Sequence, residues 1–259
     1  MYIDVIDLKA FYASRLGQIA SRLIGVRLRR QWPALSGEHV LGLGYATPFL
    51  GQFPDADRRI AFMPAAQGVV SWPTDGPNTA ALVRDDTLPL DGGSVDRVLA
   101  VHCLEHAENA PEVLREIWRV LAPGGRLIIV VPNRAGLWAR AERTPFGHGQ
   151  PYSRFQLAGL LRDTMFSPIS WSRALAALPI RNPLFLRNGA HWERVGGWLW
   201  PGFSGVLIVE ATKLMHQRVE ARPRQARTRN VLSPALAPTS GVGLRTHGLS
   251  PPEPVLRRD

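Results

Sequence analysis

Apolar residues recur every three or four positions through residues 4–30, and arginines fill the positions between them. The apolar set is Leu8, Phe11, Tyr12, Ile19, Leu23, Ile24 and Leu28, and the arginines are Arg15, Arg22, Arg27, Arg29 and Arg30. This spacing predicts an amphipathic helix with a basic face. Its apolar side fits either of two partners, the domain that follows, which is the commoner case, or an anionic membrane surface.

From residue 38 onward, short apolar runs alternate with helical stretches or long connections. Seven runs have the length and composition of strands: His39–Leu43, Arg59–Met63, Ala80–Val83, Val95–Val101, Arg126–Val131, Met165–Trp171 and Ser204–Ala211. Leu127 to Val131 is continuously apolar, as a central parallel strand requires. The alternation predicts an α/β fold with a doubly wound, mostly parallel seven-stranded sheet and helices on both faces.

Two helices have clear end signals. One is predicted over Pro111–Leu121, because proline opens it and Pro123, Gly124 and Gly125 close it. The second is predicted to begin at Ser153, whose hydroxyl and the Gln156 side chain form a capping box ahead of a leucine-rich stretch.

The chain divides into segments of different composition. Residues 1–37 carry the amphipathic helix, and residues 38–215 carry the predicted sheet, with a substrate-cap insertion at about 134–202. Residues 216–259 contain eight arginines, six prolines and no aromatic residue. Such a segment buries too little apolar surface to offset the entropy of ordering, so we expect a disordered basic tail.

Composition excludes several classes of protein. The formal net charge is +10, and arginine supplies 29 of the 31 basic residues, a skew that is typical of nucleotide-composition bias. A single cysteine, Cys103, excludes a disulfide framework and a cysteine-built zinc or iron–sulfur site. No apolar run has the roughly 18 to 20 residues that span a bilayer, and Asp4 and Asp7 interrupt the start of the chain. We therefore expect a soluble, cytoplasmic protein of undefined oligomeric state.

Three segments resemble a known family. Leu88–Val98, Leu104–His106 and Leu114–Pro132 are similar, in order and spacing, to the class I S-adenosylmethionine-dependent methyltransferases, specifically the type 11 group. The resemblance implies a Rossmann-like fold, S-adenosylmethionine as cofactor, and methyl transfer to an acceptor, for which we expect a small molecule. It extends more weakly to Phe146–Ser153, as the segment that caps the substrate pocket, and to Ser204–Ala211, as the last strand.

The glycine-rich first turn of this family is altered. At Val40–Pro48 the resemblance implies that the cofactor lies against Gly42, Leu43, Gly44 and Tyr45. Of the family's acidic residue and three glycines, only the first glycine, Gly44, is kept; Gly42, Ala46 and Pro48 stand at the other positions. Thr47 and Pro48 predict a short helix, capped by Thr47, that ends before Pro54.

The resemblance also assigns cofactor positions beyond the glycine turn. Met63 stands at the end of the second strand, where the family has an acid for the ribose hydroxyls, and its side chain accepts no such bond. Asp85 or Asp86 is placed to bind the adenine amino group. His102 lies beside the methyl donor, and the Tyr45 ring is a candidate cation–π partner for the sulfonium.

His102-Cys103-Leu104-Glu105-His106 matches an inverted zinc-protease pattern, but that chemistry needs both histidines on one helix. We predict a loop here and expect no metal. A general base is needed only if the acceptor arrives protonated. The substrate-side candidates are His106, His148 and Tyr152, and the catalytic residue stays open.

Residues 168–202 interleave tryptophans and arginines, a pattern that also occurs on surfaces that bind nucleic acid. The leading hypothesis is a methyltransferase that acts on a small molecule. The alternative is a non-catalytic protein of the same fold that has lost the cofactor and serves in binding or regulation. The altered glycine turn favours the alternative, whereas the intact stretch from Leu88 to Pro132 favours the enzyme.

Overall fold

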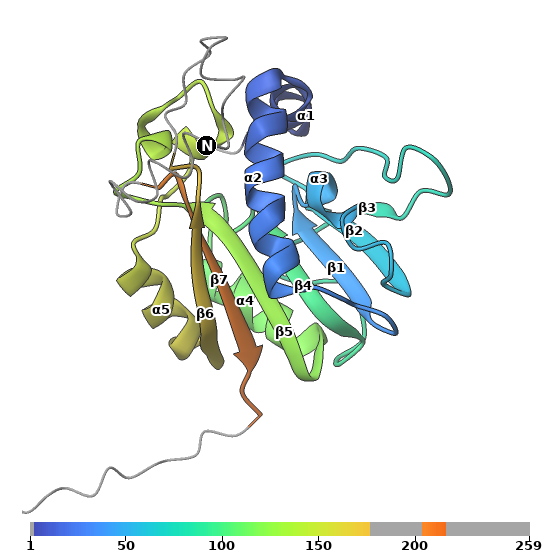
Figure 1. Ribbon diagram of the computed structural model, residues 1–259. Helices are drawn as coiled ribbons and strands as arrows, with labels where there is room; N and C mark the ends of the chain where they lie inside the picture. Colours follow the sequence, from blue (N-terminus) through green and yellow to red (C-terminus); the bar gives the residue numbers. More distant parts are fainter. Residues whose placement is uncertain (1–2, 177–203, 216–259) are drawn as a thin grey trace, which may run out of the picture. The chain divides into compact units, whose positions relative to one another are not determined.

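The computed structural model describes residues 3–176 and 204–215, which form one seven-stranded sheet. Its strands lie in the order β3-β2-β1-β4-β5-β7-β6 (Figure 1). The first five strands run parallel, and β7 pairs antiparallel with both β5 and β6. The bounds are β1 His39–Gly44, β2 Arg58–Pro64, β3 Ala80–Val83, β4 Val95–Val101, β5 Leu121–Pro132, β6 Phe166–Ala174 and β7 Val206–Lys213. The predicted fold class and all seven predicted strands are confirmed.

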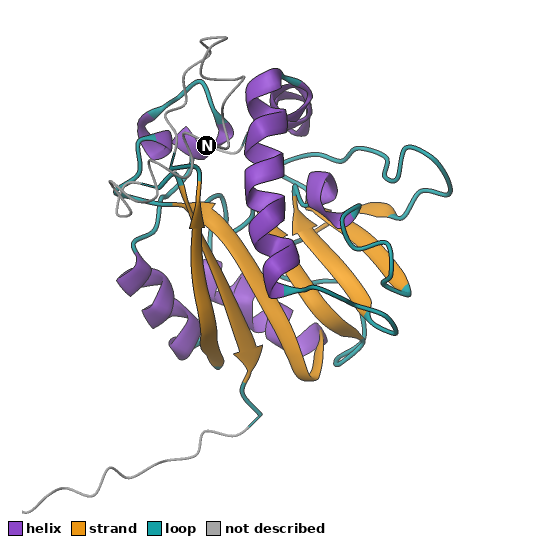
Figure 2. Ribbon diagram, viewed as in Figure 1, coloured by secondary structure: helices purple, strands orange, loops and turns teal. Residues whose placement is uncertain are grey.

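Helices cover both faces of the sheet (Figures 1 and 2). The α-helices are α1 Val5–Ala13, α2 Arg15–Gln31, α3 Thr47–Leu50, α4 Ala110–Val120 and α5 Arg154–Asp163, and two short 3-10 turns, η1 Trp138–Arg140 and η2 Pro145–Gly147, follow β5. One hydrophobic cluster joins α1, α2 and α3 to the sheet. A second cluster joins α4 and α5 to the opposite face. The described residues therefore form three layers.

The single helix predicted over residues 4–30 is two helices, so that expectation is wrong in this respect. Ser14 has extended backbone angles, and its hydroxyl accepts a hydrogen bond from the Gly17 amide at 3.1 Å, which starts α2. A side chain at Gly17 would collide with the backbone of Phe11 and Tyr12. Serine and glycine thus allow α1 to fold back against the start of α2.

The apolar side of α2 packs on the sheet, as the first interpretation held. Leu16, Ala20, Ile24 and Leu28 are buried, whereas Arg22, Arg29 and Arg30 are exposed. No helix among the described residues is both long enough and apolar enough to cross a membrane. Because α1 and α2 share one core with the sheet, the proposed segment boundary at residue 37 separates elements that pack together.

Helix α3 corrects the predicted cap at Thr47. Ala46 occupies the N-cap position without a side-chain hydrogen bond, and Thr47 is already the first helical residue. The helix has four residues and ends at Leu50, ahead of Pro54. A helix of one turn cannot cover the face of a parallel strand, and α2 occupies that face instead (Figure 1).

The opposite face follows the predicted signals closely. Helix α4 begins after Asn109, whose side chain accepts from the Glu112 amide, and it ends at the C-cap Leu121. Gly124, near the start of β5, takes the left-handed backbone angle (φ 77°). Both halves of the predicted capping box at Ser153 and Gln156 are present at the start of α5. These two helices bury the α5 leucines and the apolar side of α4 against β1, β4 and β5.

Several predictions fall outside the described residues. These are the basic tail at 216–259, most of the second half of the 134–202 insertion, and Trp192, Trp198 and Trp200 with the arginines beside them. Within the described part, Trp171 lies in β6, and the guanidinium of Arg154 covers its ring with its carbon 5.0 Å from the centroid. This tryptophan is therefore already stacked within the chain.

Candidate active site at the carboxyl ends of strands β1 and β4

Strands β1 and β4 are neighbours, although the chain runs from β1 through β2 and β3 to one side before β4 extends the sheet to the other. In such sheets, ligands bind outside the carboxyl ends of the strands where the order reverses. Here Gly44 ends β1 and Val101 ends β4, and the Tyr45 amide donates to the Val101 carbonyl at 2.7 Å. The reversal point therefore joins the altered glycine turn to the His102 loop.

Both residues at this point have left-handed backbone angles. Gly44 has φ 78°, and a Cβ there would collide with the Val101 carbonyl oxygen, so this position requires glycine for packing as well as conformation. His102 has φ 50°, an uncommon value for a residue with a side chain. Such strained residues gather at functional sites. The imidazole of His102 lies among Tyr12, Glu105 and Phe146.

Three buried side chains are hydrogen-bonded in a row, with His102 in the middle. Its Nε2 lies 2.8 Å from the Tyr12 hydroxyl of α1, and its Nδ1 lies 3.2 Å from Oε1 of Glu105. The relative exposures of Tyr12, His102 and Glu105 are 8%, 1% and 3%. The segment from His102 to His106 is a loop of bends and turns, as predicted, and not a helix.

The protonation states of Glu105 and Tyr12 decide which ring nitrogen of His102 carries a hydrogen. Burial opposes ionisation of Glu105, but the hydrogen bond from His102 and the nearby charges of His102 and His106 outweigh it and lower the pKa of the carboxyl. Burial, reinforced by the charge of Glu105, raises the pKa of Tyr12 well above its usual value. A carboxylate only accepts and a phenol keeps its proton, so Nδ1 of His102 is the nitrogen that donates to Glu105, and Nε2 is the nitrogen that faces the Tyr12 hydroxyl.

The loop that follows β2 holds Gln67, a residue that the sequence did not single out. Met63 is fully buried, and its sulfur accepts from the Val70 amide at 3.4 Å, so this side chain anchors the following loop. Gln67, in that loop, is 2% exposed and donates its amide to the His102 carbonyl at 3.0 Å. Its Oε1 is buried and has no hydrogen-bond partner among the described residues. Its backbone carbonyl also accepts from the Val5 amide at 2.8 Å, which ties α1 to this loop.

The two acidic candidates after β3 differ in environment. Asp86 is bound by Arg84 through two hydrogen bonds at 2.8 and 3.0 Å, and this contact lowers the pKa of its carboxyl. Asp85 is half-buried, and burial raises the pKa of its carboxyl. The charge of Asp85 also helps to raise the pKa of the Cys103 thiol, beside His102, although burial is the larger cause. Of the two acids, Asp85 is thus the one whose charge acts on Cys103, which is a buried neutral thiol.

Gly42 and Leu43, two of the residues expected to contact the cofactor, pack against neighbouring elements of the fold. A Cβ at Gly42 would meet Leu50 Cδ1 at 2.7 Å and the Ala46 Cβ at 2.9 Å, so Gly42 provides room for α3 against β1. The Leu43 side chain belongs to the cluster on the α4 side of the sheet. Tyr45 is buried at the strand end and stacks on Tyr12, with ring centroids 5.7 Å apart and planes 23° from parallel.

The three substrate-side candidates do not converge on one point. Tyr152 donates its hydroxyl to the Leu104 carbonyl at 3.3 Å, and burial raises its pKa to about 12. His148 is bound through Nε2 to the Glu142 carbonyl at 2.7 Å. His106 is buried, and burial is the main cause of its lowered pKa. Tyr152 and His148 are thus bound to backbone carbonyls. Nε2 of His102 has the Tyr12 hydroxyl as its partner.

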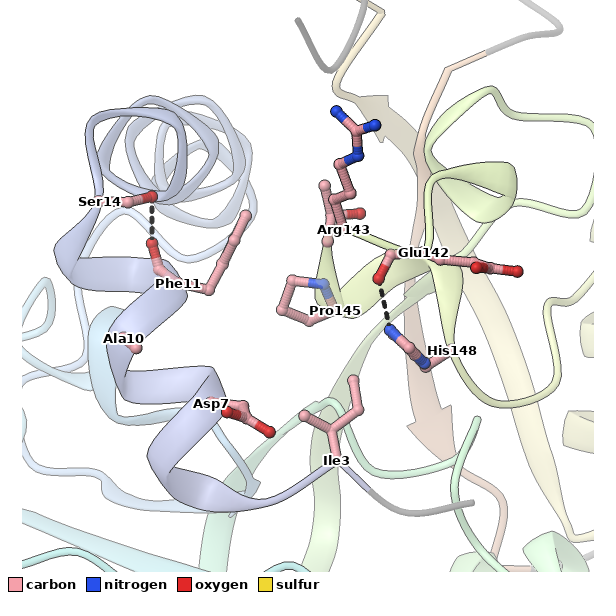
Figure 3. A pocket seen from close by; sticks show the side chains of 10 residues that line it. Ile3, Asp7, Ala10, Phe11, Ser14, Glu142, Arg143, Pro145 and His148 are labelled. Atoms are coloured by element: carbon pink, nitrogen blue, oxygen red, sulfur yellow. Dashed lines mark hydrogen bonds between the residues drawn. The ribbon is translucent and has the colours of Figure 1, made fainter. Parts of the chain in front are cut away.

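A cavity of about 430 Å³ lies between α1 and the segment 142–148 (Figure 3). Ile3, Asp7 and Phe11 line one wall, and Arg143, Pro145 and His148 line the other. The Phe146 ring lies 6.1 Å from the Phe11 ring and 4.9 Å from the His102 imidazole, measured between centroids. One aromatic layer therefore separates this cavity from His102.

His102, Glu105 and His106 each offer one possible metal-ligand atom within 4.8 Å of the others. Both ring nitrogens of His102 are already engaged, one by Glu105 and one by Tyr12. A metal ion bound through this histidine would have to break one of those buried bonds. The expectation that no metal binds here stays a prediction.

Comparison with known proteins now adds to this geometry. Residues 73–129 match a family described as "Methyltransferase domain". The 27-O-demethylrifamycin SV methyltransferase of Amycolatopsis mediterranei (strain S699) is 45% identical over 60 residues. That match covers 22% of this chain and 22% of the length of that relative.

Solved structures match over most of the chain. A SAM-dependent methyltransferase of Thermotoga maritima, described as a possible histamine N-methyltransferase, has a TM-score of 0.55 at 17% identity and covers 81% of this chain and 96% of its own. A complex of the Haloferax volcanii Trm112 methyltransferase activator and a putative methyltransferase gives 0.58 at 17% identity, covering 83% and 100%. The [4+2]-cyclase SpnF gives 0.54 at 19% identity, covering 77% and 83%. At these identities the similarity shows the fold.

Proposed function

We propose that this chain transfers a methyl group from S-adenosylmethionine to a small molecule. Two findings support the proposal: residues 73–129 match a methyltransferase-domain family, and the fold is that of solved SAM-dependent methyltransferases. The observation that carries the proposal is the meeting of Gly44, Gln67 and His102 at the reversal point of the sheet. The comparisons lend no support to the alternative of a non-catalytic protein.

The residues at this point suit an adenosine-containing cofactor. Gly44 provides the tight turn that a close backbone approach needs. Asp85, half-buried and not held by Arg84, suits the adenine amino group. Gln67 has a buried amide oxygen ready to accept from a ribose hydroxyl, and it thereby supplies the function that Met63 lacks. When bound, the cofactor supplies an electrophilic methyl group on a sulfonium sulfur.

The cavity beside α1 is the proposed entrance for the acceptor. Its volume of about 430 Å³ lies within the roughly 300–1,000 Å³ range of small-molecule sites. Its wall combines Phe11 and Pro145 with the charged side chains of Asp7 and Arg143 (Figure 3). Such a surface suits a compact, partly apolar molecule with polar substituents. The protein's main contribution is then to orient the acceptor and exclude water.

The test is calorimetric titration of the purified chain with S-adenosylmethionine and S-adenosylhomocysteine. We expect saturable binding, weakened about 10- to 150-fold by Asp85→Asn, because a hydrogen bond to a charged group contributes roughly 1.5–3 kcal/mol. Asp86→Asn is the matched control, since the same change one residue away removes only a surface contact to Arg84. Folded wild-type protein that binds neither ligand, or equal losses in both variants, would overturn the proposal.

A further inference from the structure

We propose that His102, oriented by Glu105, is the base that takes the proton from a hydroxyl group of the acceptor, and that the Tyr12 hydroxyl holds the acceptor's place while α1 is closed. This inference rests on the proposed function and assigns the catalytic residue and the class of acceptor, a phenol or similar hydroxyl compound. The sequence pointed to other side chains as base candidates.

The first support is the order of the three groups. A carboxylate, an imidazole and a hydroxyl stand in line, at 3.2 Å on one side of the ring and 2.8 Å on the other. In such arrangements the acid fixes the tautomer and stabilises the imidazolium, while the opposite nitrogen accepts a proton. Oε1 of Glu105 accepts the hydrogen bond from Nδ1. The other carboxylate oxygen of Glu105, Oε2, is buried without a hydrogen-bond partner among the described residues.

The second support is position. His102 directly follows β4 at the reversal point, beside the turn that ends β1. The group that Nε2 faces is a phenol from α1, an element outside the sheet. The bond to the Tyr12 hydroxyl shows that Nε2 of His102 has room for a phenolic oxygen at hydrogen-bond distance. Tyr12 therefore marks the location of an acceptor oxygen.

Helix α1 has few polar ties to the strand ends. Among the described residues, the Val5 amide bonds to the Gln67 carbonyl and Tyr12 bonds to His102, and the remaining contacts are apolar packing. Phe11, beside Tyr12, also lines the cavity that we assign to the acceptor (Figure 3). A shift of α1 would withdraw Tyr12 and open a path from this cavity to Nε2. The acceptor and Tyr12 thus compete for one position.

In the proposed reaction, a proton passes to His102 while a methyl group passes to the acceptor oxygen. The acceptor oxygen gives its proton to Nε2 of His102 and uses its electron pair to form a bond to the methyl carbon. The carbon–sulfur bond breaks, and its electron pair stays on sulfur as a neutral thioether. The imidazolium, stabilised by Glu105, returns its proton to solvent when α1 opens. His102 and Glu105 end in their starting charge states.

The first test follows proton position rather than turnover. Nitrogen NMR of the imidazoles should show hydrogen on Nδ1 of His102 in the free protein, and Glu105→Gln should change that signal. His39→Gln is the control, because His39 is exposed at the far end of β1. Hydrogen found on Nε2 of wild-type His102 would overturn the inference, since that nitrogen would have no lone pair to accept a proton.

The second test uses 4-nitrophenol, whose ionised form is coloured. We expect wild-type protein to bind it as the phenolate, His102→Gln to abolish the colour change, and Tyr12→Phe to tighten binding roughly fivefold by removing a competing hydrogen bond. The ionisable groups around His102 are Tyr12 from α1, with Tyr45 stacked on it, and Cys103, Glu105 and His106 in its own loop.

The outcomes separate this inference from the proposed function. Binding of S-adenosylmethionine without ionisation of 4-nitrophenol, or with ionisation that survives His102→Gln, overturns the base assignment alone. Ionisation that depends on His102, in protein that binds no S-adenosylmethionine, supports the base and overturns the proposed reaction. The third measurement adds cobalt(II) to the protein and records the visible absorption spectrum, because His102, Glu105 and His106 lie close enough to hold a metal ion. Absorption bands that disappear in His102→Gln would identify a metal centre and overturn the base assignment.

Discussion

Replacing Ile24 by alanine measures how strongly helix α2 holds the sheet. Ile24 is fully buried in the cluster that joins α1, α2 and α3 to the strands, and α2 covers the face that the four-residue α3 leaves open. Truncating a buried isoleucine costs about 2–5 kcal/mol, part from lost transfer energy and part from the cavity. For a domain of this size we expect Tm to fall by roughly 5–15 °C.

Val26→Ala, on the same helix, is the control. Val26 is 36% exposed and faces away from the sheet, so its truncation should lower the free energy of unfolding by less than about 1 kcal/mol. Circular dichroism during thermal and urea unfolding gives both values. If Ile24→Ala cost no more than Val26→Ala, α2 would not be part of the cooperative fold, and its apolar face would be available to a membrane.

Two further changes test local features. Gly17→Ala places a methyl group against the backbone of Phe11 and Tyr12, so we expect a loss of about 1–3 kcal/mol in urea unfolding; Gly159→Ala, with open space around it in α5, should be neutral or stabilising by up to about 1 kcal/mol. Glu105 has a lowered pKa in the folded chain, so its stabilisation is present above the unfolded pKa and is lost as pH falls through the folded one. Glu105→Gln should therefore cost about 1.5–3 kcal/mol near neutral pH, with a gap to wild type that narrows in acid; a gap that widened in acid would contradict the assigned charge state.

The sheet could be predicted from sequence because each strand carries its own signal. Central strands such as β5 are continuously apolar, and Asn109, Gly124 and Ser153 mark the adjoining helix ends through local chemistry. The break at Ser14 was missed because the apolar spacing continues across it. Whether a helix bends there depends on Gly17 packing against the preceding turn, which a periodicity does not reveal.

The site was predictable only in part. Gly44 and His102 follow predicted strands, so the rule for doubly wound sheets places them together. Tyr12 and Gln67 carry no motif, and they reach the site because α1 folds over it and the β2–β3 loop turns back under it. For His106 and Tyr152, the sequence predicts proximity to the loop, but it reveals neither the burial of both side chains nor the bond from Tyr152 to the Leu104 carbonyl.

The departures from the glycine-rich pattern have a packing explanation. Gly42 must be small because Leu50 and Ala46 of the α3 turn lie directly on β1, and a longer residue at position 46 would push that turn away. With α3 so short and so close, α2 packs on the same face and α1 brings Tyr12 to His102. The altered turn and the aromatic cover over the strand ends are thus parts of one arrangement. Under the proposal that α1 controls access to His102, ligand affinity should respond to changes at Tyr12 more than to restored glycines.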